Sequence, residues 1–217
     1  MRVSDRLTEH SYLTVARDAV AEVEVERSRF RCTVARVTEE GEARSVVESI
    51  RREHWDARHH CFGFVLGPDR MAEQSSDDGE PPGTAGAPIL QQLRGRELSD
   101  VVAVVTRWFG GTLLGTGGLV RAYSAATRAA LDEAGLVERV RHHVYEVTVD
   151  FTDAGRLEHD LRARGARVLG VEYTGEAQLR FAVPPGSHGV SEEIVAELTG
   201  GSAVPVAVGE QWVDTPR

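Results

Sequence analysis

A glycine-rich segment is where this chain could bind an anion. Five of the nine residues from Gly110 to Gly118 are glycine, and they join an apolar run to an amphipathic one. Glycine lets other groups approach the backbone closely, and the start of a helix presents N–H groups and partial positive charge. Arg107 and Arg121 flank the segment and add charge and hydrogen-bond donors. The residues predicted to form this anion or nucleic-acid site are Arg107, Trp108, Gly110, Gly111, Gly115, Thr116, Gly117, Gly118 and Arg121.

The segment matches no common nucleotide-binding motif. The chain contains no lysine, which excludes a lysine-based phosphate loop, and the one GxGxxG-like fragment is out of register. The pattern therefore indicates an anion without naming it. The alternative is a packing loop in which the glycines only let a helix and a strand approach each other.

A histidine pair and an acidic segment are a second group of chemically capable residues. His59, His60 and Cys61 could supply metal ligands, but neighbouring residues of a strand point to opposite faces, so we predict no metal site. Asp77, Asp78 and Glu80 are expected in a solvated loop over the glycine segment rather than as a catalytic pair. No serine lies in a GxSxG element, and no catalytic residue or cofactor is predicted. The residues that could contribute to the anion site from this side are His59, Asp77, Asp78, Glu80, Thr84 and Gly86.

Three aromatic residues flank the glycines and could stack on bases. They are Trp108, Phe109 and Tyr123. The alternative, which we favour, places Phe109 and Tyr123 in the core and leaves only Trp108 partly exposed.

Composition indicates an ordinary globular protein. The 217 residues are 41% hydrophobic and 27% charged, which suits one or two domains, and we predict two. The formal net charge of −9 argues against nucleic-acid binding over the whole surface. Between Ala85 and Leu131, however, five arginines outnumber two acids, so an anion site belongs there. No run approaches the roughly 20 apolar residues of a spanning helix, and no secretion signal follows Met1 to Arg6, so we expect a cytoplasmic protein without membrane contact.

Hydrophobic periodicity predicts alternating strands and helices in the first part of the chain. We expect strands at 20–26, 30–37, 60–66 and 101–106, with a tight connection at 27–29. We expect helices at 41–53, from Pro88 through Leu93, and from Leu119 to Ala134, the last ended by Gly135. A long polar connection is expected from 67 to 86. Cys32 and Cys61 fall in strands and are expected as reduced core thiols.

The pattern restarts near residue 143. It reads as strand 144–151, a helix through Leu157 and Leu161, strand 168–173, hairpin 174–176, strand 179–183, helix 190–198 and strand 204–208. This β-α-β-β-α-β order is typical of a ferredoxin-like domain. We therefore place a domain boundary near 139–142.

Three segments resemble the signatures of a known family. Residues 56–61, 76–90 and 107–123 are similar to those of the bacterial YigZ family, relatives of the eukaryotic IMPACT proteins. The resemblance implies an α+β protein of two domains. Residues 1–140 would form an IMPACT-like domain with the fold of the second domain of a small-subunit ribosomal protein. Residues 141–217 would form a ferredoxin-like domain similar to the C-terminal domain of elongation factor G. Pro82 departs from the family, where a smaller residue is common, and stiffens the acidic segment.

The expected function is that of a non-enzymatic, translation-linked binding or regulatory protein. It would contact RNA, ribosomal phosphate or a translation partner through the glycine-rich loop, and its second domain would dock a protein or RNA partner. Eukaryotic IMPACT proteins act in translational control by binding a partner of a stress kinase, a role that we do not carry over. Two alternatives remain: an enzyme acting on a phosphorylated small molecule, with Asp77 or Asp78 as base or magnesium ligand, and an adaptor that binds only protein.

Overall fold

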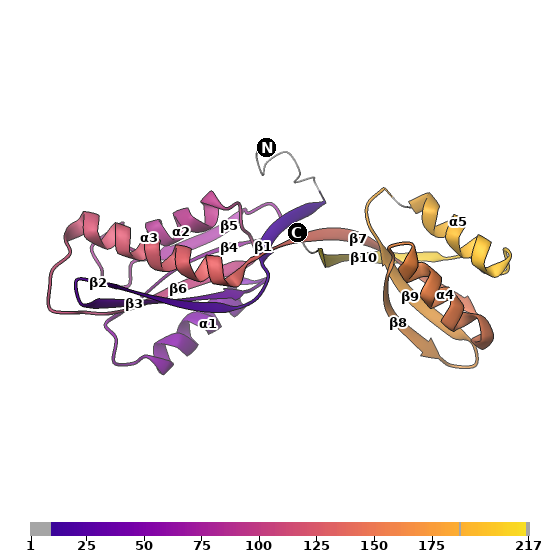
Figure 1. The fold of residues 1–217 in the computed structure, drawn as a ribbon, viewed down its shortest axis with the longest axis horizontal. Helices are drawn as coiled ribbons and strands as arrows, with labels where there is room; N and C mark the ends of the chain where they lie inside the picture. Colours follow the sequence, from indigo (N-terminus) through magenta and orange to yellow (C-terminus); the bar gives the residue numbers. More distant parts are fainter. Residues whose placement is uncertain (1–9, 187, 216–217) are drawn as a thin grey trace. The chain divides into compact units, whose positions relative to one another are not determined.

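The chain folds into two compact units, seen in a computed structural model that describes residues 10–186 and 188–215 (Figure 1). The first unit comprises Tyr12–Glu138, and the second comprises residues 10–11 and Arg139–Thr215. Each contains a mixed set of helices and strands, so the predicted two-domain α+β fold class is confirmed. The secretion-signal expectation concerns residues 1–6, which lie outside the described residues.

The first unit is built on one antiparallel sheet. From edge to edge its strands are β2 (Ala19–Val25), β3 (Ser28–Arg36), β6 (Val101–Trp108), β4 (His59–Leu66) and β5 (Ala72–Ser76). The central strand β6 is buried from Val101 to Arg107. Burial on both faces explains why its sequence is a continuous apolar run rather than an alternating one. A further strand, β1 (Ser11–Val15), bridges Leu98 through Leu13 and was not indicated by the sequence pattern.

Helices cover both faces of this sheet (Figure 1). Helix α1 (Glu40–Glu53) packs on one face, where its Val47 and Ile50 join a core with Phe62 and Phe64. Helices α2 (Gly86–Gly95) and α3 (Gly115–Ala134) cover the other face. Successive residues of β4 and β6 therefore face α1 and α3 in turn, which decides where each side chain of the predicted site lies.

The long connection predicted from 67 to 86 is wrong in part, because it contains the edge strand β5. This strand pairs with β4, with Ser76 opposite Phe62 and Ala72 opposite Leu66. Ala72 to Ser75 are exposed, so the strand carries no apolar alternation. Strand β5 is held in place by backbone hydrogen bonds to β4, and backbone bonds leave no hydrophobic pattern in the sequence.

Two further predicted boundaries are also wrong. The turn between β2 and β3 is made by Glu26 and Arg27, both with positive φ, rather than by residues 27–29. This pair of left-handed residues is the geometry that matches the twist of a two-residue hairpin. Helix α3 begins at Gly115 rather than Leu119, so Arg121 lies in its second turn. Its end at Gly135, which has a φ of 65°, is as predicted.

The second unit has the predicted β-α-β-β-α-β order. Its elements are β7 (Leu136–Val149), α4 (Phe151–Ala163), β8 (Arg167–Tyr173), β9 (Ala177–Val183), α5 (His188–Thr199) and β10 (Val206–Thr215). Strand β9 pairs with β7 and β8, and β10 pairs with β7. Leu157 and Leu161 of α4 and Val195 of α5 share one core with Leu179 and Phe181 of β9. The two helices therefore cover one face of this sheet.

None of the helices in the described ranges combines the length and the apolar character needed to cross a membrane.

Candidate functional site

The acidic segment, the end of β6 and the start of α3 enclose a pocket of about 430 Å³ in the first unit. Its polar lining residues are Arg58, His59, Glu80, Arg107, Gly115 and Thr116. Its apolar lining residues are Pro81, Phe109, Leu113, Leu114 and Leu119. Members of all three sequence motifs thus meet here, with two arginines against one glutamate.

Strand alternation decides which predicted residues reach this pocket. His59 and Arg107 lie on the α3 side of the sheet, opposite each other in the β4–β6 register. Trp108 faces the other side, where its ring contacts His54 and lies 4.1 Å from the Arg29 guanidinium carbon. Its Nε1 donates to Asp56 at 2.8 Å. Trp108 is therefore held apart from the predicted site.

A buried ion pair forms the base of the pocket. Glu80 Oε1 lies 2.6 Å from Arg107 Nη1, and the same oxygen accepts a hydrogen bond from the Tyr123 hydroxyl at 2.8 Å. Arg107 is further held between the rings of Phe30 and Phe109, at 5.3 and 5.7 Å. Burial raises the pKa of Tyr123 well above its usual value, and neighbouring Cys61 and Glu80 add to the effect. The phenol is therefore neutral and acts as a hydrogen-bond donor.

The carboxylate of Asp77 organises the backbone of the acidic segment. Its oxygens accept N–H bonds from Gly83 at 2.8 Å, Ala85 at 3.0 Å and Gly86 at 2.8 Å. Burial alone would raise the pKa of Asp77, but these three bonds together lower it below the usual value. Asp77 therefore holds the backbone that leads into the first residue of α2, and it does not line the pocket.

Asp78, Thr84 and Gly86 also hold the segment together. Asp78 Oδ2 accepts the His60 N–H at 2.7 Å, and its Oδ1 pairs with Arg51 at 3.1 Å. Thr84 is buried and donates its hydroxyl to the Pro81 carbonyl at 2.7 Å. A Cβ on Gly86 would lie 2.8 Å from the Ser76 backbone. These three predicted residues shape the pocket wall without facing the pocket.

The two histidines separate as the strand period requires. His60 is buried on the α1 side, with Nδ1 3.2 Å from the Thr106 hydroxyl. Burial lowers the pKa of His60. His59 lines the pocket, and its Nδ1 lies 2.8 Å from the Asp78 carbonyl oxygen. Within the described residues, no three histidine, cysteine or acidic side chains converge as metal ligands.

The glycines of the segment have different structural reasons to be glycine. A Cβ on Gly110 would lie 2.0 Å from the Arg27 backbone, and one on Gly118 would lie 2.9 Å from Leu114 Cβ. Gly111 and Gly115 have φ values of 88° and 67°, in the left-handed region. Gly117 has neither constraint, since its nearest neighbour would be the Arg121 guanidinium at 3.5 Å. A glycine in a helix is less favourable than alanine, by up to about 1 kcal/mol in the helix interior, so neither packing nor conformation explains a glycine at position 117.

The N-terminus of α3 is uncapped. Leu114 occupies the cap position without a side-chain hydrogen bond, and no acidic residue lies in the first turn. The first N–H groups of a helix have no acceptor inside it, and they carry partial positive charge. They remain available at the edge of the pocket, where Gly115 and Thr116 are exposed.

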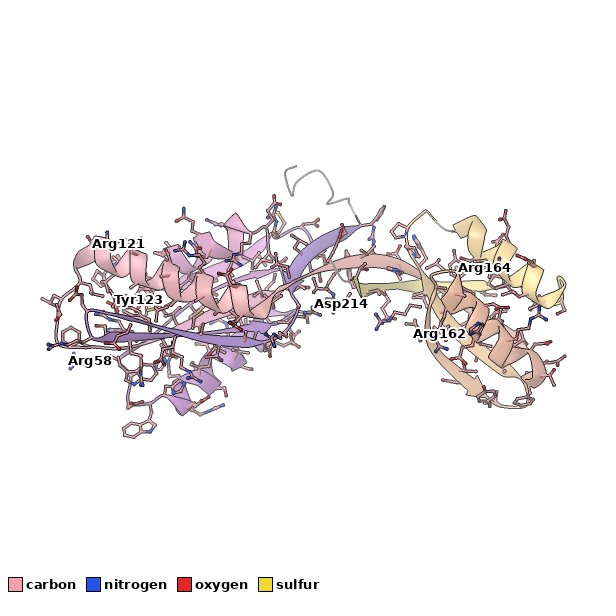
Figure 2. The ribbon with its side chains drawn as sticks, in the orientation of Figure 1. Arg58, Arg121, Tyr123, Arg162, Arg164 and Asp214 are labelled. Atoms are coloured by element: carbon pink, nitrogen blue, oxygen red, sulfur yellow. The ribbon has the colours of Figure 1, made fainter. Side chains whose placement is uncertain are left out.

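Two exposed arginines lie at this end of the unit (Figure 2). Arg58 belongs to the pocket, whereas Arg121 lines an adjoining hollow together with Val25 and Glu26. Leu113 and Leu114 border both hollows. The predicted cations therefore flank the glycine segment from two sides and do not converge on one point.

Phe109 differs from the prediction that it is a core residue. Its side chain is 50% exposed, because the chain leaves β6 at Trp108 and turns away from the sheet. Tyr123 is fully buried as predicted, with its ring 5.2 Å from that of Phe30. Arg58 is a pocket residue that was not predicted from the sequence, although its position next to His59, just before a strand, was an available signal.

Both thiols are buried and free, as predicted. Burial raises the pKa of Cys32 to about 12, although a hydrogen bond with Thr127 acts in the opposite direction. Burial raises the pKa of Cys61 still further. Neither is a thiolate nucleophile near neutral pH.

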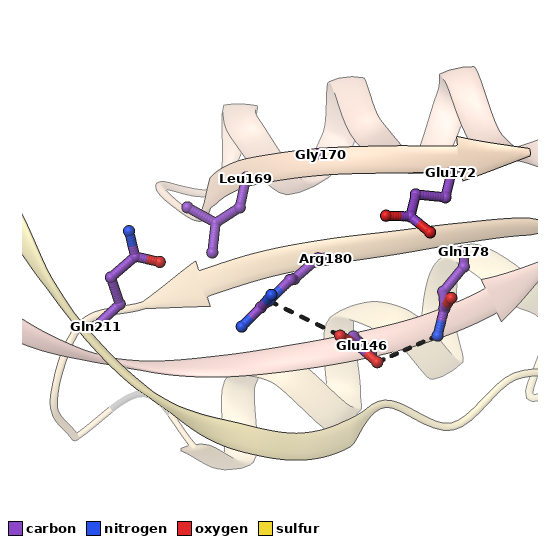
Figure 3. Close-up of a pocket in the computed structure, with 7 residues that line it drawn as sticks. All are labelled: Glu146, Leu169, Gly170, Glu172, Gln178, Arg180 and Gln211. Carbon is purple, nitrogen blue, oxygen red and sulfur yellow. Dashed lines mark hydrogen bonds and ion pairs between the residues drawn. The ribbon is translucent and has the colours of Figure 1, made fainter.

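The second unit has a separate hollow on the face of its sheet without helices (Figure 3). Glu146 is one of its lining residues, and it accepts a hydrogen bond from Gln178 at 3.1 Å and pairs with Arg180 at 3.8 Å. Glu172 adds a second carboxylate to the lining. Arg180 is already paired with Glu146, and Glu172 adds a further negative charge, so the lining of this hollow is acidic overall.

These features define a two-domain α+β protein whose first domain carries a polar-rimmed pocket beside the start of its long helix. Residues 26–131 match the Impact N-terminal domain, and residues 147–202 match a domain of unknown function, DUF1949. The chain belongs to the IMPACT family.

Individual relatives agree with this assignment over most of the chain. It is 38% identical to the IMPACT family member YvyE of Bacillus subtilis, with 89% of each chain covered. It is 35% identical to the IMPACT family member YigZ of Escherichia coli, over 92% of this chain and 99% of the relative. A crystal structure described as that of a hypothetical protein matches with a TM-score of 0.62 and 35% identity, covering 94% of this chain and all of the other.

Proposed function

We propose that this protein is a translation-linked RNA-binding regulator whose first unit holds the RNA backbone at the start of α3. The observation that carries the proposal is the pocket itself, which combines an uncapped helix N-terminus with Arg58, Arg107 and the exposed ring of Phe109. The helix N–H groups and Arg58 suit a phosphate, and Phe109 offers a face for a base. We expect such a role to be carried out in the cytoplasm.

Gly117 supports a ligand at this place. A backbone that a phosphate must approach closely favours glycine, and neither conformation nor packing among the described residues demands it here. Arg121 lies over the same turn and adds a second cation beside it. The acidic hollow of the second unit favours a protein over a nucleic acid, so we assign that unit to docking a translation-related protein.

The carboxylates do not favour the enzymatic alternative. Asp77 and Asp78 are engaged by backbone N–H groups and Arg51, and Glu80 is engaged by Arg107 and Tyr123. A base or a magnesium ligand would have to give up these bonds. The binding experiment described next therefore includes an outcome that would favour the enzyme.

The test is fluorescence anisotropy of a labelled single-stranded RNA against the full chain across a range of salt concentrations. Affinity should fall as salt rises, and Arg58→Ala and Arg121→Ala should each lower the slope of log K against log salt by about 0.7. The matched control is Arg52→Ala, an exposed arginine on α1 that carries the same charge change on the other face. It should leave the slope unchanged.

Two results would contradict the proposal. Failure of RNA to bind at low salt would exclude direct recognition of RNA. Stabilisation of the protein by a phosphorylated metabolite with magnesium would then favour the enzymatic alternative. Equal slope losses in all three variants would show attraction by general charge without a site at α3.

A further inference from the structure

We infer that His59 makes the pocket selective for ribose, by accepting a hydrogen bond from the 2′-hydroxyl of the bound nucleotide. The inference rests on the proposed RNA-binding function and names the residue that would distinguish RNA from DNA. It arises from the orientation of the imidazole ring, which the fold determines independently of any ligand.

One hydrogen bond determines where the proton of the neutral ring lies. His59 Nδ1 is 2.8 Å from the Asp78 carbonyl oxygen, which can only accept. Nδ1 must therefore carry the proton, and Nε2 is left as an acceptor. Asp78 itself is fixed, because its carboxylate binds the His60 N–H and Arg51.

The backbone of the acidic segment covers one edge of the ring. A Cβ on Gly79 would lie 3.5 Å from His59 Nδ1 and 3.6 Å from Cε1, so the segment packs against that edge. His59 is one of the residues that line the pocket, and no hydrogen bond to its Nε2 is found among the described residues. His59 is half-buried, so a ligand meets an acceptor partly shielded from water.

Most of the polar groups around the pocket donate hydrogen bonds, and His59 Nε2 is an acceptor placed among them. Arg58, Arg107 and the α3 amides all donate, the Thr116 hydroxyl can donate or accept, and Glu80 Oε1 is already bonded to Arg107 and Tyr123. A phosphate has no donor for His59, whereas a ribose hydroxyl does. A ribonucleotide therefore matches the pocket in three ways: its phosphate faces the donors, its base faces Phe109, and its sugar faces His59. The 2′-hydroxyl of that sugar is the group that distinguishes RNA from DNA.

The test compares labelled oligouridylate with oligodeoxyuridylate of equal length by anisotropy at pH 8, where free imidazole is neutral. The wild-type chain should bind the ribose form about two- to tenfold more tightly, the range of one net hydrogen bond. His59→Asn keeps a side-chain amide where Nδ1 donates to Asp78, but lacks an atom at Nε2. It should bind the two oligomers equally.

His59→Gln and His159→Ala complete the design. Glutamine carries an amide oxygen that reaches the Nε2 position, so His59→Gln should retain the ribose preference. His159 is an exposed histidine on α4 of the second unit, and its removal should change nothing.

Each result has a separate meaning. Equal binding of both oligomers by the wild type, or a preference that survives in His59→Asn, would overturn the role of His59 while RNA binding stands. Failure of both oligomers to bind at low salt would overturn the proposed function and this inference with it.

Discussion

Glu80 and Arg107 form a buried ion pair that ties the acidic segment to the end of β6. Their nearest atoms are 2.6 Å apart, and the side chains are only 4% and 7% exposed. The pair also supports Tyr123 of α3 through the shared carboxylate oxygen. Three elements that are distant in sequence therefore meet at one oxygen beneath the pocket.

Removing one partner of this pair should be costly. Glu80→Gln leaves the Arg107 charge buried without compensation, and we expect a loss of about 3 kcal/mol in the free energy of unfolding. Adding Arg107→Met removes the stranded charge, so the double variant should lose less than the two single variants together. Urea unfolding followed by circular dichroism measures all three, and additive losses would show that the two groups are not coupled.

Asp77 should stabilise the first unit in a pH-dependent way. Asp77→Asn places an amide where three N–H groups donate, and we expect a loss of about 1–2 kcal/mol. Because the pKa of Asp77 is lowered on folding, its stabilisation is full above the ordinary aspartate pKa of about 3.9 and is lost as pH falls through the folded value. Unfolding measured from pH 7 to pH 2.5 should show the wild type and variant converging below pH 4. A constant difference down to the lowest pH would contradict this assignment.

The sequence predicted the elements whose patterns come from burial. The apolar run of β6 and the helical spacing of Val47 and Ile50 in α1 reflect the core directly. The exposed β5 gave no such signal, because its hydrogen bonds to β4 are made by backbone atoms alone.

The pocket could be predicted only in outline. Strand alternation correctly separated His59 from His60, but the same rule also separates Arg107 from Trp108, which the sequence analysis had grouped together. The roles of Asp77 and Glu80 depend on contacts between segments that no local pattern encodes. Phe109 was misjudged because exposure after the end of a strand depends on how the chain turns.

Two glycine substitutions should distinguish packing from ligand approach. Gly110→Ala would bring a Cβ within 2.0 Å of the Arg27 backbone, so we expect severe destabilisation or failure to fold. Gly117→Ala meets only the flexible Arg121 side chain and removes a glycine from a helix, so it should stabilise the chain by up to about 1 kcal/mol. Thermal unfolding tests both.

RNA affinity separates the two roles further. If a phosphate approaches the backbone at Gly117, the stabilised Gly117→Ala variant should bind RNA more weakly than the wild type. Undiminished binding would assign Gly117 no part in the site.

Both thiols should be inert in the folded chain. Cys32 and Cys61 are buried and their pKa values are raised, that of Cys32 to about 12, so neither presents a thiolate near neutral pH. A thiol reagent such as dithiobis(nitrobenzoate) should release no product from native protein at pH 8. In concentrated urea it should report both cysteines, and fast reaction of the native protein would show that the first unit opens readily.

Phe109 should contribute more to RNA affinity than to the stability of the fold. Its ring is 50% exposed beside the pocket, so Phe109→Ala should change the free energy of unfolding by less than about 1 kcal/mol. Loss of one stacked base is worth roughly 1–3 kcal/mol, which weakens RNA binding by about fivefold to 150-fold. Phe151→Ala is a matched control, because Phe151 is 51% exposed in the second unit. Anisotropy with the same labelled RNA should show a loss for Phe109→Ala alone. An equal loss in both variants would show that stacking is not confined to the pocket, and no loss in either would leave the phosphate contacts of α3 to supply the affinity.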